Sequence, residues 1–150
     1  MKKDLDRKGK VSADIMETVG NLYKVYNARL RAECIKIGVH SSYRQIISYL
    51  AKEDGVPQLE LVRLTNFKAP TISITLQKME NEGYVLRKPD LFDQRCVRVY
   101  LTDKGREFNN KMDKKVREIE AEIAANLTVE ELEDCFGSLE KLFLELLKQS

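Results

Sequence analysis

The clearest candidates for chemistry lie in a charged loop between two short segments of alternating apolar residues. The segments span 84–86 and 97–101, and the loop between them carries Asp90, Asp93 and Arg95 but no glycine. A carboxylate two residues before an arginine can orient the guanidinium toward an external anion, and charge-assisted contacts of that kind are strong. The competing interpretation is a solvated salt bridge on a surface loop, which contributes at most ~1 kcal/mol to stability.

The elements that must position this loop are mostly helices. Apolar residues recur at three-to-four spacing before and after the loop, and capping residues, glycines and prolines mark the ends of these runs. The predicted helices start at Ser12, at Ser41 or Ser42, at Gln58, at Pro70, at Thr102, and at Thr128, where Glu131 completes a capping box. Four helices, a hairpin and two further helices predict an α+β, mostly helical fold in a single domain over 1–150.

The third and fourth predicted helices have the spacing of a helix-turn-helix. A short helix over 58–65 and the turn 66–68 precede a second helix, and this geometry can place the second helix in the major groove of DNA. Hydroxyl, amide and ammonium groups on its outer face can reach base edges or phosphates. The polar residues predicted to lie there are Lys68, Thr71, Ser73, Thr75, Gln77 and Lys78. An ordinary amphipathic surface helix would share this pattern.

The hairpin that follows favours the DNA-binding interpretation. Its loop is longer than most hairpin connections, and long loops tend to be functional or mobile. With Asp93 two residues earlier, Arg95 suits the narrow, negatively charged minor groove beside the site that the helix reads.

Composition narrows the possible functions. The net charge of +2 divides into +7 over residues 1–106 and −5 over residues 107–150, so an anionic partner is expected at the first part of the chain. One histidine, no glycine-rich phosphate loop and no metal-ligand spacing argue against an enzyme, a cofactor and a metal site. No apolar run reaches the ~18–20 residues of a membrane span. The N-terminus has no secretory apolar stretch, and three scattered cysteines fit a reduced, cytoplasmic protein.

One long stretch of the chain, APTISITLQKMENEGYVLRKPDLFDQRCVRVYLTDKG, resembles the MarR (multiple antibiotic resistance regulator) family of bacterial winged-helix regulators. Three motifs carry the resemblance: Glu80-x-x-Gly83, Asp93-x-Arg95 and Leu101-Thr102-x-x-Gly105. The stretch GVHSSYRQIISYLAKEDGVPQLELVRLT is similar to the second and third helices of the family, so the resemblance extends over nearly the whole chain.

The resemblance implies an architecture and a function. It implies a winged helix-turn-helix lobe over about 41–101, and dimerisation helices over about 12–38 and 103–148. The implied function is that of a sequence-specific, double-stranded DNA-binding transcriptional regulator, a homodimeric repressor that a small-molecule effector releases from a pseudo-palindromic operator. The apolar stripe of the last helix, which includes Leu132, Phe136, Leu139, Phe143 and Leu146, fits such a dimer, although it could also pack within its own monomer.

The resemblance also assigns roles to the candidate DNA-binding residues. Arg95 would enter the minor groove with Asp93 orienting it, while the major groove would be met by Thr71, Ser73, Thr75 and Lys78. Nearby phosphates would be met by Lys68, Arg87 and Lys88. Many family members have an arginine where this chain has Ile74, which could touch a thymine methyl group or pack inward.

Family members often bind small aromatic or phenolic anions in a cleft beside the DNA-binding lobe. By analogy, the candidate ligand residues are Tyr23, Tyr26, His40, Tyr43 and Arg44, with His40 also a candidate helix cap. Two alternative functions stay open, a cysteine-based redox-responsive regulator and a winged-helix protein-interaction module. For the redox alternative, Cys96 follows the wing arginine, Cys34 ends the first helix, and Cys135 is predicted to fill the core.

Overall fold

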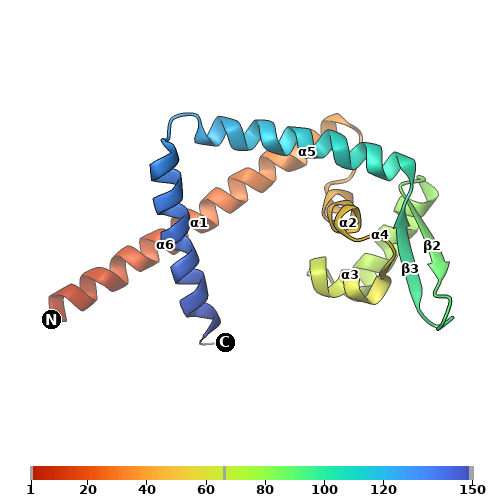
Figure 1. Ribbon diagram of the computed structural model, residues 1–150, viewed down its shortest axis with the longest axis horizontal. Helices are drawn as coiled ribbons and strands as arrows, with labels where there is room; N and C mark the ends of the chain where they lie inside the picture. Colours follow the sequence, from red (N-terminus) through yellow and green to blue (C-terminus); the bar gives the residue numbers. More distant parts are fainter. Residues whose placement is uncertain (1, 66, 149–150) are drawn as a thin grey trace. The chain divides into compact units, whose positions relative to one another are not determined.

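A computed structural model describes residues 2–65 and 67–148, and these fold into helices and one small sheet (Figure 1). The elements are α1 (Lys2–Lys36), α2 (Ser41–Lys52), β1 (Val56–Pro57), α3 (Gln58–Thr65), α4 (Ala69–Asn81), β2 (Val85–Pro89), β3 (Val97–Leu101), α5 (Asp103–Ala124) and α6 (Val129–Leu147). The chain divides into two compact units, one ending at Asp113 and the other beginning at Lys114. The predicted α+β, mostly helical fold is confirmed.

The first helix is longer than predicted at its N-terminal end. Ser12 does not cap it, because α1 begins at Lys2 and ends at Lys36, short of the predicted stop at Gly38. The residues before Ser12 are mostly lysine, arginine and aspartate, and the long basic side chains among them are good helix formers. Asp4 lies in the first turn, where a negative charge favours the helix dipole.

The core of the first unit lies between α2, α3, α4 and the sheet, which Figure 1 shows side by side. The inward residues predicted for α4, Ile72, Leu76 and Met79, are fully buried. They pack in the cluster that also includes Ile46, Leu50, Leu61, Val85 and Val99. This packing confirms the 3.6-residue periodicity from which the helix-turn-helix was predicted.

The sheet has three antiparallel strands in the order β1-β3-β2, one more strand than the sequence predicted. Val85 pairs with Leu101 and Pro89 with Val97, so β2 and β3 form the predicted hairpin. β1 adds a short pairing of Val56 with Val99. The hairpin therefore rests on α3 and α4 through a buried strand face, and its loop extends beyond them.

The turn into α5 explains the glycine of the Leu101-Thr102-x-x-Gly105 motif. Thr102 Oγ1 accepts a hydrogen bond from the Gly105 N–H at 3.1 Å and donates one to the Gly83 carbonyl at 2.6 Å. A Cβ atom at Gly105 would overlap the carbonyl oxygen of Tyr84. The start of α5 is thereby fixed against Gly83 and Tyr84, which follow the end of α4.

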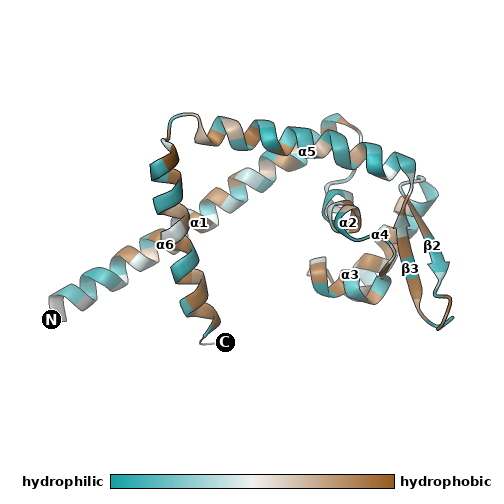
Figure 2. Ribbon diagram, viewed as in Figure 1, coloured by the Kyte–Doolittle hydropathy of each residue, from teal (hydrophilic) through white to brown (hydrophobic). Residues whose placement is uncertain are grey.

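The second unit contains the end of α5 and α6. The predicted capping box is present: Thr128 Oγ1 accepts from the Glu131 N–H at 3.2 Å, and Glu131 Oε2 accepts from the Thr128 N–H at 2.8 Å. Figure 2 shows hydrophobic residues along α6, and Phe136, Phe143 and Leu146 are all exposed. Cys135 is exposed as well, so the prediction that it fills the core is wrong for the single chain, because its helix buries no residue there.

Candidate nucleic-acid interface

The exposed face of α4 carries most of the residues that were predicted to face outward. Thr71, Ser73, Gln77 and Lys78 are exposed, and Lys68 is exposed at the N-cap position of the helix. Thr75 is the exception, because only 8% of it is accessible. It follows Ile72 by three residues and precedes Met79 by four, so it lies on the buried stripe of the helix. The prediction that Thr75 lies on the outward face of the helix is therefore wrong.

Ile74 lies at the centre of the exposed face. Its exposed fraction is 60%, so the alternative that it packs inward is excluded. Residues three and four positions away in a helix are its neighbours on the surface, and here they are Pro70, Thr71, Gln77 and Lys78.

An ion pair ties the end of α4 to β2. Arg87 Nε donates to Glu80 Oε2 at 2.8 Å, Arg87 Nη2 lies 2.7 Å from the same oxygen, and the Arg87 backbone N–H donates to Glu80 Oε1 at 3.0 Å. Arg87 Nη2 also donates to Gln77 Oε1 at 3.1 Å. These hydrogen bonds lower the pKa of Glu80. The guanidinium of Arg87, predicted to meet a phosphate, is thus engaged within the chain.

The loop of the hairpin, the wing, is stiffened by a carboxylate that the sequence did not single out for this role. Asp90 accepts hydrogen bonds from the backbone N–H groups of Phe92 at 2.8 Å and Asp93 at 3.1 Å, and it forms an ion pair with Arg98. Arg98 Nη1 also donates to the Gly55 carbonyl at 2.8 Å. The Arg98 hydrogen bond, reinforced by the two backbone donors, lowers the pKa of Asp90 to about 2.

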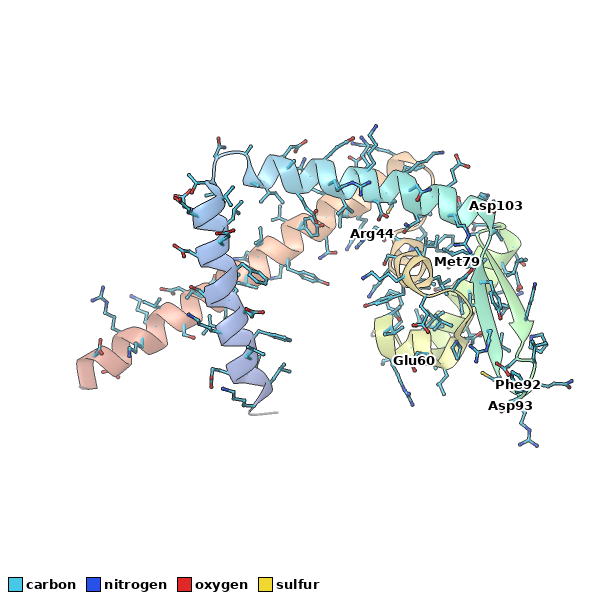
Figure 3. The ribbon with its side chains drawn as sticks, viewed as in Figure 1. Arg44, Glu60, Met79, Phe92, Asp93 and Asp103 are labelled. Carbon is cyan, nitrogen blue, oxygen red and sulfur yellow. The ribbon has the colours of Figure 1, made fainter. Side chains whose placement is uncertain are left out.

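The predicted partnership of Asp93 and Arg95 takes a different form. Asp93 Oδ1 accepts from the backbone N–H of Arg95 at 3.0 Å, so the carboxylate fixes the backbone and not the guanidinium. The Arg95 side chain is exposed, and among the described residues its guanidinium has neither a hydrogen bond nor an ion pair. Figure 3 shows Phe92 and Asp93 at the far end of the hairpin from Asp103.

The wing and the helix-turn-helix border one groove. This groove has a volume of about 440 Å³ and is lined by Gln58, Leu59 and Val62 of α3, Ala69 of α4, and Asp93, Arg95, Cys96 and Val97. Lys88 is exposed on β2, with its Nζ atom 5.7 Å from the centroid of the Tyr100 ring. The groove therefore brings Arg95 of the wing beside Ala69 at the start of α4.

The candidate ligand residues separate into two groups. Tyr23, His40 and Arg44 line a groove of about 410 Å³ together with Asn27, Leu30, Arg31, Ser41, Ser42, Gln45 and Phe67. Tyr26 is not in this lining, and Tyr43 is buried, with its hydroxyl donating to Glu82 Oε1 at 2.9 Å. Burial, together with that hydrogen bond, raises the pKa of Tyr43 to about 12. The prediction that Tyr43 contacts a ligand is therefore not supported by its position.

His40 has the capping role that was weighed against ligand binding. Its Nδ1 atom accepts a hydrogen bond from the backbone N–H of Ser42 at 3.2 Å, which makes it the N-cap of α2. The same residue borders the groove beside Tyr23 and Arg44. The prediction that His40 is a helix cap is therefore confirmed.

The fold and part of the sequence are similar to those of known regulators. No family model matches the chain. The uncharacterized HTH-type transcriptional regulator YdgJ of Bacillus subtilis (strain 168) is 28% identical over 119 residues, which are 79% of this chain and 71% of that protein. A MarR transcriptional regulator from Methanosarcina mazei Go1 is 27% identical, with a TM-score of 0.77 over 91% of this chain and 98% of that one.

A MarR family protein from Bacillus stearothermophilus matches at a TM-score of 0.81 over 92% of this chain and 96% of that one. At 20% identity it supports the fold alone. In the described part of the chain, no helix is both long and apolar enough to span a membrane. The resemblance predicted from the sequence is confirmed by these structures.

Proposed function

We propose that this chain, a MarR-family winged helix-turn-helix protein, is a sequence-specific transcriptional regulator that binds double-stranded DNA as a homodimer. The observation that carries the proposal is the guanidinium of Arg95. It is exposed and unpaired among the described residues, and it projects from a wing that Asp90 and Asp93 hold rigid. Because the wing backbone is already held, an anion that binds Arg95 orders the side chain but need not order the loop.

In the proposed complex, α4 enters the major groove. Thr71, Ser73 and Lys78 supply its polar contacts, and Lys68 and Lys88 meet flanking phosphates. Arg95 lies in the adjacent minor groove, because a narrow minor groove has an enhanced negative potential that attracts a guanidinium.

The dimer is proposed from the apolar surface of the terminal helices. Leu22 and Val25 of α1 and Phe136, Phe143 and Leu146 of α6 are each more than half exposed in the single chain. Large exposed apolar patches mark interaction sites, and a two-fold axis would present two α4 helices to half-sites about 10 bp apart. The proposed helices for this interface are α1, α5 and α6.

We further propose that the dimer is a cytoplasmic repressor released by a small aromatic or phenolic anion. Arg44 and His40 beside Tyr23 combine a positive charge with aromatic surface in the 410 Å³ groove. An effector there can release DNA only by binding more tightly to a conformation that spaces the α4 helices unfavourably.

The test is selection of bound duplexes from random DNA, followed by titration of the selected duplex at several salt concentrations. We expect a palindromic sequence, a steep negative salt dependence, and a loss of affinity of about 10- to 100-fold in Arg95→Ala. Lys52→Ala, which removes an exposed positive charge from the end of α2, outside the proposed DNA contacts and dimer helices, is the matched control and should bind nearly as well as the wild type. If the DNA affinity is weak, the same for every duplex sequence and unchanged in Arg95→Ala, a protein-interaction role for the winged helix would be favoured.

A further inference from the structure

The exposed face of α4 combines one apolar side chain, Ile74, with one amide of fixed orientation, Gln77. Ile74 is 60% exposed in a helix whose other exposed side chains nearby are polar or small. A single exposed isoleucine is common on protein surfaces and by itself indicates nothing. The amide of Gln77, one turn further along the same face, supplies the second observation.

The orientation of Gln77 follows from its partner. A guanidinium has only donors, so the atom of Gln77 that faces Arg87 Nη2 at 3.1 Å must be the carbonyl oxygen Oε1. Arg87 is itself held by two contacts to Glu80, and it cannot easily turn away. The amide nitrogen of Gln77 is consequently turned away from Arg87, with its hydrogens available to an external acceptor.

We propose that Ile74 and Gln77 together read a thymine in the major groove, and that Glu80 and Arg87 are the residues that position Gln77. Ile74 contacts the C5 methyl group, and the Gln77 amide donates to O4. Thymine alone presents a methyl group beside an acceptor on this edge, whereas cytosine presents a donor in place of O4. This inference rests on the proposed function, because it requires α4 to lie in the major groove.

The pair rejects the other bases for separate reasons. Cytosine would set its amino group against the Gln77 donor, leaving both donors unpaired and desolvated. Adenine and guanine would offer an acceptor but no methyl group to cover the apolar surface of Ile74. Cytosine also lacks the methyl group, so Ile74 disfavours all three other bases, and the Gln77 amide adds a second penalty against cytosine.

The first test uses the duplex selected by the wild-type protein, with each thymine replaced in turn by deoxyuridine. This change removes only the methyl group and keeps O4. We expect one thymine in each half-site at which the replacement lowers affinity about fourfold, the effect of one lost methyl contact. Ile74→Ala should bind the thymine duplex about fourfold more weakly and should no longer respond to deoxyuridine.

The second test isolates the amide. Replacing the thymine–adenine pair by a 5-methylcytosine–guanine pair keeps the methyl group at this position but exchanges the O4 acceptor for an amino donor. The wild type should discriminate against 5-methylcytosine by about tenfold or more, and Arg87→Ala should lose most of this discrimination because its Gln77 amide is free to turn over. Asn81→Ala, a change at the exposed end of the same helix and outside the proposed DNA contacts, should keep both responses.

The outcomes separate this inference from the proposed function. If no duplex is enriched in the selection, both fall. If a palindrome is enriched but deoxyuridine is neutral at every position, or if Ile74→Ala keeps the wild-type response to it, only the thymine-reading inference is overturned. The thermal unfolding of Ile74→Ala should match that of the wild type, because the Ile74 side chain is mostly exposed.

Discussion

The ion pair between Glu80 and Arg87 should contribute measurably to stability, because it joins the end of α4 to β2. Its two side chains are 30% and 21% exposed, and the carboxylate accepts both guanidinium and backbone hydrogen bonds. Hydrogen bonds to charged groups contribute about 1.5–3 kcal/mol when buried. Partial exposure places this pair near the lower end, so Arg87→Ala should lower the free energy of unfolding by about 1.5 kcal/mol.

The pH dependence of this effect has a defined sign. The hydrogen bonds from Arg87 lower the pKa of Glu80 in the folded state. A carboxylate shifted in this direction stabilises the fold above its unfolded-state pKa, and the contribution is lost as the pH falls through the folded-state value. The difference between wild type and Arg87→Ala should therefore be largest at about pH 7 and should shrink toward about pH 3.

Urea denaturation of wild type, Glu80→Gln, Arg87→Ala and the double variant measures the coupling free energy directly, and we expect about 1 kcal/mol. The matched control is the pair Arg63–Glu60 within α3, whose side chains are 72% and 42% exposed. Arg63→Ala should change stability by less than about 0.5 kcal/mol. If the losses in unfolding free energy of Glu80→Gln and Arg87→Ala simply add in the double variant, the reasoning that this contact holds β2 to α4 is refuted.

Three further predictions concern other parts of the chain. Thr128→Ala, which removes the capping-box acceptor, should lower the free energy of unfolding by about 1 kcal/mol in urea denaturation. Tyr43 should titrate late in an ultraviolet pH titration, at about pH 12. Because its pKa is raised on folding, the stabilisation that Tyr43→Phe removes should be complete below about pH 10 and should be lost as the pH rises from about 10 through about 12. Phe136→Glu should yield monomers in light scattering, whereas Asp134→Lys, a charge reversal on the same exposed helix, should not; a dimeric Phe136→Glu would contradict the proposed interface.

Helices with strong apolar periodicity could be predicted from the sequence. Each element or residue that was missed has its own physical reason. The bounds of α3 and the buried stripe of α4 were predicted correctly because glycine, proline and three-to-four spacing agree there. β1 was missed because two residues, one of them proline, carry no periodicity, and their pairing with β3 is distant in sequence. Thr75 was misplaced by its polarity, although its spacing from Ile72 and Met79 could have identified it as buried.

The wing illustrates what only the folded hairpin can supply. Sequence proximity favoured Asp93 as the partner of the Arg95 guanidinium, but the pairing of Lys88 with Arg98 brings Asp90 against Arg98 instead. This arrangement suits anion binding better than the predicted one. A guanidinium already paired with a neighbouring carboxylate must give up that contact before it binds a phosphate. In this wing the acidic side chains hold the backbone and Arg98, so the backbone of Arg95 is held in place while its guanidinium stays available.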